Sequence, residues 1–249
     1  MLPTGQIIAI VSGKGGTGKT SFTANAGMAL AQMGHRTLCF DSDIGLRNLD
    51  IALQMTDRAV MDFTDVLAGF CPLKDAVVPH PQVKNLYLLT APSRYNETAD
   101  SEKLAAMFAE IREMFDYCLV DAPAGLETGF RLAISSADRA VVVTNTDASS
   151  LRDAQRTVME LSHLGRGRVH LVVNRCRKKL MKSLHQTIDD AIDTAGLPLL
   201  GVIPEDETMP LYAGRGIPLL LSDNHYAAQA YRNIARRITG HRAPLLRIR

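Results

Sequence analysis

Short apolar runs, separated by stretches of helical spacing, divide the chain into alternating elements. Most of the runs are continuously apolar rather than alternating, which is typical of strands that helices cover on both faces. They predict strands at Gln6–Val11, Arg36–Phe40, Asn85–Leu89, Tyr117–Val120, Ala140–Thr144, Val169–Val173 and Leu199–Ile203.

Apolar stripes of helical period predict helices at Thr20–Met33, Ser101–Phe115 and Tyr226–Thr239. Gly34 can cap the first helix, whereas Gly240 and Pro244 prevent the third from continuing. The stripe of the third helix predicts packing on the core; it consists of Ala227, Tyr231, Ile234 and Ile238.

Strands that alternate with helices predict an α/β fold, a doubly wound and mostly parallel sheet flanked by helices. No repeat, low-complexity tract or linker interrupts the pattern. We therefore expect one domain over residues 1–240, followed by a short basic tail over residues 241–249.

Composition narrows the class of protein without naming it. Of the 249 residues, 46% are hydrophobic and 22% charged, and the net charge of +2 provides no global field for nucleic acid. Six arginines and no acid lie between Arg232 and Arg249. The cysteines lack metal-ligand spacing, and Cys39 and Cys118 lie in apolar runs, which favours buried thiols in a reducing cytoplasm. We expect no leader peptide and no membrane span.

The stretch IIAIVSGKGGTGKTS carries the chemistry. Gly13-x4-Gly18-Lys19-Thr20 fits a phosphate-binding loop between a strand and a helix. Backbone N–H groups and the helix end surround the phosphates, Lys19 neutralises their charge, and Thr20 offers a hydroxyl to Mg²⁺. The candidate nucleotide-binding residues here are Gly13, Lys14, Gly15, Gly16, Thr17, Gly18, Lys19, Thr20 and Ser21. Lys14 is a second lysine that this role does not need.

Carboxylates follow two of the predicted strands. In YCLVDAPAG, Asp121 ends an apolar run, as expected of a residue that organises a metal beside the loop. In DSDIGLRNLD, Asp41 could support the metal shell and Asp43 could reach an attacking water. All three come to the carboxyl edge of the predicted sheet, where the phosphates lie.

These motifs resemble those of the ParA/MinD group of ATPases. SGKGGTGKTS is similar to the group's deviant Walker A loop, in which a signature lysine occupies the Lys14 position. Within the group, DSDIGLRNLD and VDAPAGLETG resemble switches I and II of the MinD branch, the septum-site-determining ATPases. TNTDASSLRDAQR resembles its partner-facing helix, while LVVNR and LLGVIPED resemble its base-binding segments. The likeness spans about Ile7 to Thr239.

The resemblance implies a Mg²⁺-dependent ATPase that binds ATP and ADP and dimerises with ATP. Lys14 would cross to the phosphates of the partner chain, and Asp43 would orient water. Asp121 would link Mg²⁺ to switch II through water. Asn174 would contact adenine, and Pro204 would pack beside it.

The resemblance also implies a cycle in which the ATP dimer binds the membrane and recruits a MinC-like division inhibitor. The partner surface would include Ser149, Ser150, Arg152 and Asp153, although a capped surface helix explains them almost as well. A cytoplasmic protein that associates peripherally with the inner face of the cell membrane is expected. Branch members attach through a C-terminal amphipathic helix, whereas here Leu245, Leu246 and Ile248 with two arginines offer only a minimal foot. The basic tail would fit contact with anionic lipid, a solvated chain end or nonspecific contact with DNA equally well.

Other members of the group provide the alternatives. A ParA-like partition protein would need a basic surface for DNA, which the net charge does not support outside the tail. A flagellar-number regulator commonly has an activation segment before the loop, and a metal-cluster carrier needs cysteines that meet at the dimer axis. A small-molecule kinase would need a substrate lid. The sequence fits each of these less well than the MinD branch.

Overall fold

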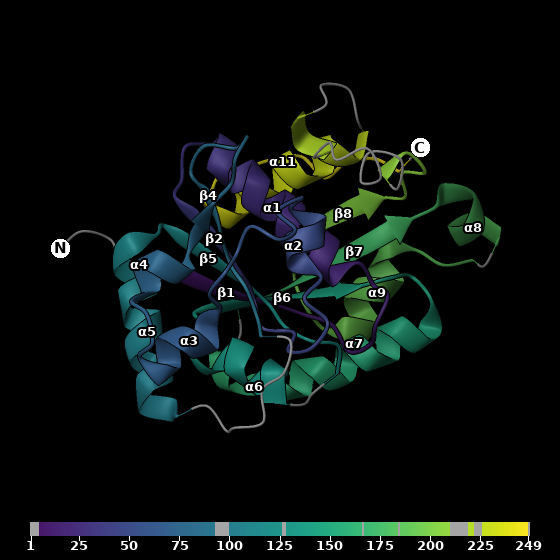
Figure 1. The fold of residues 1–249 in the computed structure, drawn as a ribbon. Coiled ribbons are helices and arrows are strands. Elements are labelled where there is room, and N and C mark those ends of the chain that lie inside the picture. The colour runs from purple at the N-terminus through teal and green to yellow at the C-terminus, as the bar shows by residue number, and fades with distance from the viewer. Residues whose placement is uncertain are drawn as a thin grey trace.

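A computed structural model describes residues 5–92, 100–125, 128–165, 167–183, 185–209, 219–221 and 226–248. Within them, one eight-stranded sheet has the order β3-β4-β2-β5-β1-β6-β7-β8 (Figure 1). The strands are β1 (Gln6–Val11), β2 (Thr37–Asp41), β3 (Val78–Pro79), β4 (Leu86–Leu89), β5 (Tyr117–Asp121), β6 (Arg139–Thr144), β7 (Val169–Cys176) and β8 (Leu199–Pro204). All neighbours are parallel except β3 and β4.

The predicted fold class and all seven predicted strands are confirmed, with small differences at their ends. Strand β3 was not expected. It is only two residues long, contains a proline and pairs antiparallel at the sheet edge, so no apolar run marks it.

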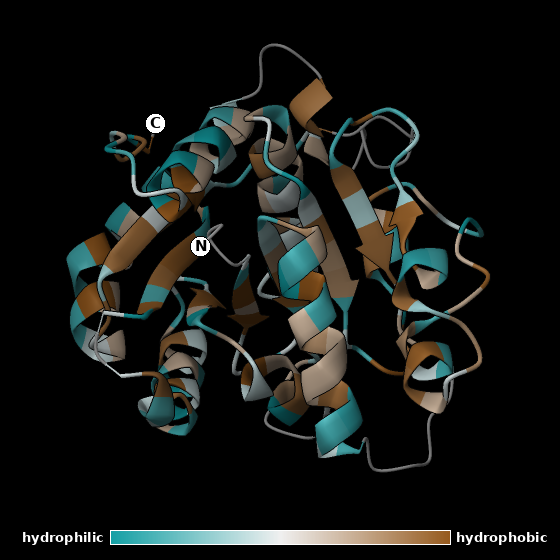
Figure 2. Ribbon diagram, turned by 90° about the vertical axis from the view of Figure 1, so that its left-hand side faces the viewer, coloured by the Kyte–Doolittle hydropathy of each residue, from teal (hydrophilic) through white to brown (hydrophobic). Residues whose placement is uncertain are grey.

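Helices cover both faces of the sheet. One face carries α1 (Lys19–Gln32), α2 (Leu49–Ala52) and α11 (Tyr226–Ile238) together with the 3-10 turn η2 (Leu219–Leu221). The remaining helical elements are α3 (Phe63–Ala68), α4 (Leu73–Ala76), α5 (Ser101–Met114), α6 (Thr128–Ser135), α7 (Ala148–Glu160), η1 (Ser162–Leu164), α8 (Lys178–Ser183) and α9 (Ile188–Ala195). Figure 2 shows largely hydrophobic strands lying between helices that contain both hydrophilic and hydrophobic residues.

Strand β1 shows how the two apolar layers arise from a continuous run. Ile7 and Ala9 face the layer under α5, α7 and α9, whereas Ile8 and Ile10 face α1 and α11. All four side chains are completely buried. Because successive residues of a strand point to opposite faces, a strand covered on both faces has no polar positions to alternate with.

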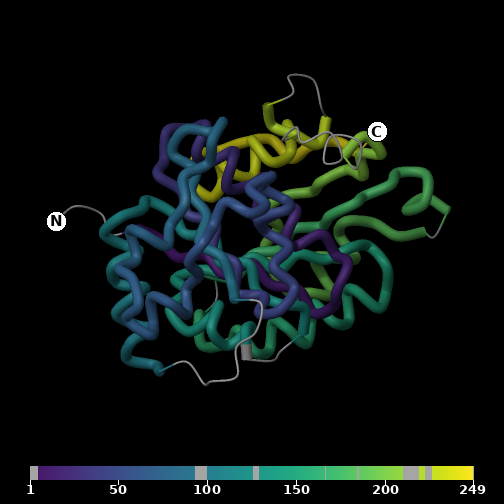
Figure 3. Tube along the Cα trace, in the orientation of Figure 1, coloured from purple at the N-terminus to yellow at the C-terminus, as the bar shows by residue number. Residues whose placement is uncertain are grey.

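The first and last described helices, α1 and α11, are in contact although they are far apart in the sequence. α1 and α11 run side by side over the sheet (Figure 3), and the ring centroids of Phe22 and Tyr231 are 6.2 Å apart. The predicted core stripe of α11 is confirmed, because its four members are at most 3% exposed. Gly34, with φ of 97°, ends α1 in a left-handed conformation.

The tail does not present its apolar residues as a free foot. Leu246 and Ile248 pack against the core, and only Leu245 is largely exposed. Asn233 Nδ2 donates to the Pro244 carbonyl at 3.0 Å, and Arg237 Nη2 donates to the Ala243 carbonyl at 2.7 Å. The expected foot is therefore folded back on α11 and β8 here. Among the described residues, no helix has the length and apolarity that a membrane crossing requires.

Phe40 anchors the core between β2 and the helices beside it. Its ring centroid lies 5.3 Å from that of Phe63 and 5.8 Å from that of Phe108, and all three rings are buried. We expect Phe40→Ala to lower the free energy of unfolding by about 3–5 kcal/mol, because it removes apolar contacts and leaves a cavity. Phe70→Ala is the matched control: Phe70 is 79% exposed, so its loss should cost no more than about 0.5 kcal/mol. Urea denaturation measures the free energy of unfolding of both variants, and equal losses would contradict the placement of Phe40 in the core.

His80 makes stability depend on pH. Its Nε2 lies 2.9 Å from the Leu53 carbonyl oxygen, and its Nδ1 accepts from the backbone N–H groups of Gln82 and Val83. Burial lowers the pKa of His80 from its ordinary 6.5. As the pH falls, His80 is protonated in the unfolded chain at a higher pH than in the folded protein. The contribution of neutral His80 to the free energy of unfolding is therefore fully present above about pH 6.5 and is lost on acidification.

We expect His80→Gln to flatten the fall in the free energy of unfolding between about pH 7 and about pH 5. The exposed His163 provides the control, and His163→Gln should leave the slope as it is. An unchanged slope in His80→Gln would show that another group governs the acid limb.

Candidate nucleotide site

The phosphate-binding loop leaves β1 where the strand order reverses, between β5 on one side and β6 on the other. Gly16 and Gly18 have φ of 81° and 87°, a left-handed conformation that side chains rarely adopt. Asn174 on β7 fixes the loop, since its Nδ2 donates to the Thr17 carbonyl at 2.8 Å. The loop is thus tied to β7 by a side-chain hydrogen bond.

Asp121 is the centre of the polar cluster under the loop. It is 1% exposed and accepts hydrogen bonds from Thr20 Oγ1 at 2.7 Å and Thr23 Oγ1 at 2.8 Å. Lys19 Nζ lies 3.4 Å from Asp121 Oδ1, and the lysine is 7% exposed. The structure therefore places Lys19, Thr20 and Asp121 together, as the sequence predicted. Thr23 was missed; it lies one helical turn after Lys19 on the same face of α1.

Asp41 and Asp43 behave differently from one another. Asp41 is paired in register with Asp121, and burial followed by the charge of Asp121 raises its pKa to about 7. Its two carboxylate oxygens accept the backbone N–H groups of Asp43 at 2.9 Å and Leu49 at 3.2 Å. Asp43 is only partly buried; burial raises its pKa, and the charge of Lys19 opposes the rise. Asp41 thus holds the loop that presents Asp43 near Lys19.

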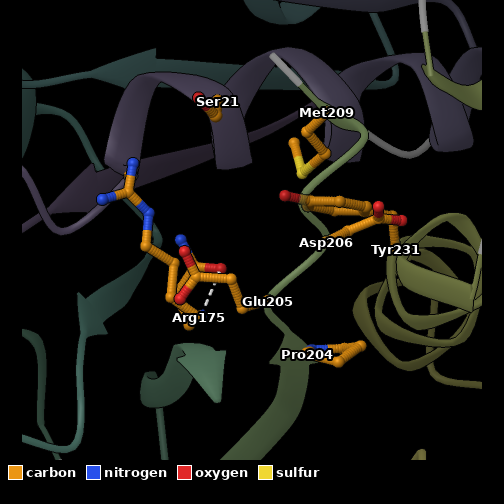
Figure 4. Close-up of a pocket in the computed structure, with 9 residues that line it drawn as sticks. Ser21, Arg175, Pro204, Glu205, Asp206, Met209 and Tyr231 are labelled. Atoms are coloured by element: carbon orange, nitrogen blue, oxygen red, sulfur yellow. Dashed lines mark hydrogen bonds between the residues drawn. The ribbon is translucent and has the colours of Figure 1, made fainter. Parts of the chain in front are cut away.

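A cavity of about 330 Å³ opens beside the loop and shares Gly18 and Ser21 with it. Asn174 and Pro204 line this cavity, where the resemblance expected the base. Figure 4 shows Ser21 at one end and Pro204 at the other, with Arg175 on one side and Met209 and Tyr231 on the opposite side. Arg175 lies in the segment LVVNR, which resembles a base-binding segment, but it was not itself predicted as a site residue. Met209 and Tyr231 were not predicted either, because only the fold brings them beside β7 and the loop.

The residues present fit a nucleotide with its magnesium ion. Thr17 Oγ1 is buried without a partner among the described residues, and the buried ammonium of Lys19 has one carboxylate beside it. A Cβ on Gly18 would lie 2.3 Å from Asn174 Nδ2, so a side chain there would disturb the cradle. The hydroxyl of Thr20 and the carboxylate of Asp121 are the hard oxygen donors that Mg²⁺ prefers.

Lys14 contacts the start of α7, whereas Lys19 contacts Asp121. Its Nζ lies 3.1 Å from Asp147 Oδ1 and 2.8 Å from Ser149 Oγ, at the start of α7. Although burial opposes the effect, hydrogen bonds from Ser150, Ser149 and Lys14 lower the pKa of Asp147. The carboxylate is therefore charged and holds the lysine on the exposed edge of the loop. Asp147 was not predicted as a site residue.

Of the four residues predicted for the partner surface on α7, three are exposed or partly exposed and one is buried in the single chain. Ser149 and Arg152 are exposed, and Asp153 is partly exposed. Ser150, in contrast, is 2% exposed, and its hydroxyl and backbone N–H both bind Asp147, the residue that caps the helix. Ser150 therefore supports the helix cap in the single chain.

Comparisons with known proteins agree with this geometry. The family described as CobQ/CobB/MinD/ParA nucleotide binding domain matches residues 8–219. The septum site-determining protein MinD of Bacillus subtilis (strain 168) is 40% identical over 245 residues, which cover 97% of this chain and 91% of that protein. The chain belongs to the MinD family.

Solved MinD structures have the same fold. In the MinC:MinD cell division protein complex of Aquifex aeolicus, a chain that is 39% identical superposes with a TM-score of 0.90, covering 98% of this chain and 99% of that one. The MinD of Pyrococcus horikoshii, solved with Mg-ADP, is 34% identical with a TM-score of 0.80, covering 94% of this chain and 95% of that one. As a member of the MinD family, the chain is a P-loop ATPase with a nucleotide-binding domain.

Proposed function

We propose that the chain is a Mg²⁺-dependent, ATP-driven dimerisation switch of the MinD type that positions the cell-division site. The observation that carries this proposal is the place of Lys14. Lys19 already occupies the buried position for neutralising phosphate charge, while Lys14 lies on the exposed edge of the loop and contacts α7. A second cation at that edge is suited to the phosphates of another copy of the chain.

Each residue of the site has one task in this proposal. The loop N–H groups, Lys19 and Thr17 bind the phosphates, and Asn174 and Pro204 hold the base beside Ser21. Bound Mg²⁺ would neutralise phosphate charge, with Thr20 and Asp121 as the residues that hold it, Asp121 through water. Asp43, kept in place by Asp41, orients the attacking water. In the dimer, Lys14 stabilises the charge that develops on the partner's phosphoryl group.

The proposed cycle also requires a protein partner and a membrane surface. We propose that residues 1–240 act as one ATPase domain, that the ATP dimer associates with the inner face of the cell membrane, and that it binds a MinC-like inhibitor. The MinD chain from Aquifex was solved with MinC, and Ser149, Arg152 and Asp153 remain available here on α7. For the membrane step, the tail would have to leave its contacts with α11 and β8.

Sedimentation with anionic vesicles, and separately with duplex DNA, tests the switch in the presence of Mg²⁺ with ATP or ADP. We expect pelleting with vesicles in ATP and not in ADP, recruitment of a MinC-like inhibitor to those vesicles, and ATP hydrolysis that stops when Mg²⁺ is removed. ATP-dependent pelleting with DNA and not with vesicles would instead favour the ParA-like function.

A further inference from the structure

A second polar cavity, of about 330 Å³, lies at the opposite edge of the sheet from the nucleotide site. It opens at the amino ends of β1, β6 and β7, whose order is visible in Figure 1. Because β1 has six residues, about 20 Å separate this edge from the phosphate-binding loop. The cavity is lined by Gly5, Gln6, Arg112, Asp138, Arg139, Gly167 and Arg168.

Arg112 and Asp138 form a neutral frame for the cavity. The Arg112 guanidinium pairs with Asp138 and also donates to the carbonyl oxygens of Gly5 at 3.0 Å and Ser136 at 2.8 Å. Asp138 Oδ2 accepts a further hydrogen bond from the Ile7 N–H at 2.8 Å. Both side chains are thus held in place by several bonds, and neither charge is left over for a ligand.

Arg139 is a cation whose described polar contact is the C-terminal end of α11 rather than a carboxylate. It is partly buried, and its Nη1 donates to the Ile238 carbonyl at the end of α11 at 2.8 Å. No carboxylate of the described residues forms an ion pair with it. Burial lowers the pKa of Arg139, and the same cation contributes to lowering the pKa of His170 after burial itself. One carbonyl is a small compensation for a guanidinium with five N–H donors.

Arg168 adds a second cation, which forms no ion pair among the described residues. Gly165 and Gly167 have φ of 77° and 88°, which lets the chain turn tightly into β7. The Arg168 carbonyl accepts from the Ala140 N–H at 2.9 Å, so its backbone is tied to β6. Its side chain is exposed and makes no ion pair within the described part of the chain. The lining residues therefore carry three positive charges and one negative charge.

We propose that this cavity is a second anion site, which binds a phosphate group between Arg139 and Arg168. Planar guanidinium groups match the oxygens of phosphate bidentately, and a partly buried cation gains most from an anionic partner. The site needs neither the nucleotide nor a dimer. A soluble phosphate ion and the phosphate of a lipid headgroup share this chemistry.

Inorganic phosphate is the first probe, titrated by calorimetry or NMR into the full chain. A saturating non-hydrolysable ATP analogue with Mg²⁺ keeps the P-loop occupied, so that only a second site can respond. We expect saturable binding that weakens at least about tenfold in Arg168→Glu, because that change reverses one of the two charges. Arg139→Gln should weaken it similarly, and Arg58→Ala, on an exposed arginine outside the cavity, should leave it unchanged.

Vesicles with and without phosphatidylglycerol then distinguish the two sources. If Arg168→Glu loses phosphate binding but still sediments with the anionic vesicles as the wild type does, the site takes a soluble phosphate. If the same variant loses both, the site takes a headgroup phosphate. Because Arg168 is exposed, the variant should fold and bind nucleotide normally. Equal phosphate and vesicle binding by the wild type and Arg168→Glu would overturn the proposal.

Discussion

Lys14→Ala should lower ATP hydrolysis by about a thousandfold while nucleotide binding to the single chain changes little. A cation supplied by a neighbouring chain contributes about 10³–10⁵ to phosphoryl transfer where it has been measured. The Lys14 ammonium is held by Asp147 and Ser149, whereas Lys19 and Thr20 bind Asp121 and Asn174 binds the Thr17 carbonyl. Steady-state phosphate release and the affinity of a fluorescent ATP analogue measure the two effects.

A mixture of two inactive variants tests whether Lys14 acts across the dimer. In a mixed dimer of Lys14→Ala and Asp43→Ala, one site has its own Asp43 and receives Lys14 from the other chain, whereas the other site lacks both. Since about half of the dimers in an equal mixture are mixed, hydrolysis should recover to about a quarter of the wild-type rate. If Lys14 served its own chain, neither site would be complete and the mixture would stay inactive.

Gly18→Ala should reduce nucleotide affinity at least about thirtyfold. The residue has φ of 87°, and an added Cβ would lie 2.3 Å from Asn174 Nδ2, which anchors the loop by donating to the Thr17 carbonyl. Backbone strain of about 1–2 kcal/mol together with the loss of a buried hydrogen bond worth about 1–3 kcal/mol drives the loop out of its binding conformation. Every 1.4 kcal/mol is worth about a factor of ten in affinity.

Gly16→Ala separates the two contributions. Gly16 has nearly the same φ, 81°, but an added Cβ there meets nothing within 4 Å. It should therefore show the strain alone and retain more affinity than Gly18→Ala. Both affinities come from the same fluorescence titration, and a larger loss in Gly16→Ala would mean that the contact with Asn174 is not what holds the loop.

The sequence predicted what depends on local pattern. Continuous apolar runs identify buried parallel strands, and the strand–loop–helix context identifies Lys19 and Thr20. The role of Asp41 depends on its register with Asp121, and the contact of Lys14 with Asp147 joins residues from opposite halves of the chain. Ser150 was predicted to lie on the partner surface because its helix resembles a partner-facing one. In the single chain it is buried and its hydroxyl binds Asp147, a contact that a resemblance between sequences does not predict.

Because β1 lies in the middle of the sheet, it can pair with its neighbours only after much of the chain has been synthesised. Gln6 pairs with Tyr117 of β5, and Ile8 pairs with Arg139 of β6, so the first strand waits for more than a hundred residues before it has a neighbour. The loop that follows it is anchored later still, by Asn174. Pairing between strands that are far apart in the sequence slows folding, and the apolar strands stay exposed to solvent until their partners are available. A nascent chain that ends before β7 should therefore emerge from the ribosome unable to retain nucleotide and dependent on chaperones.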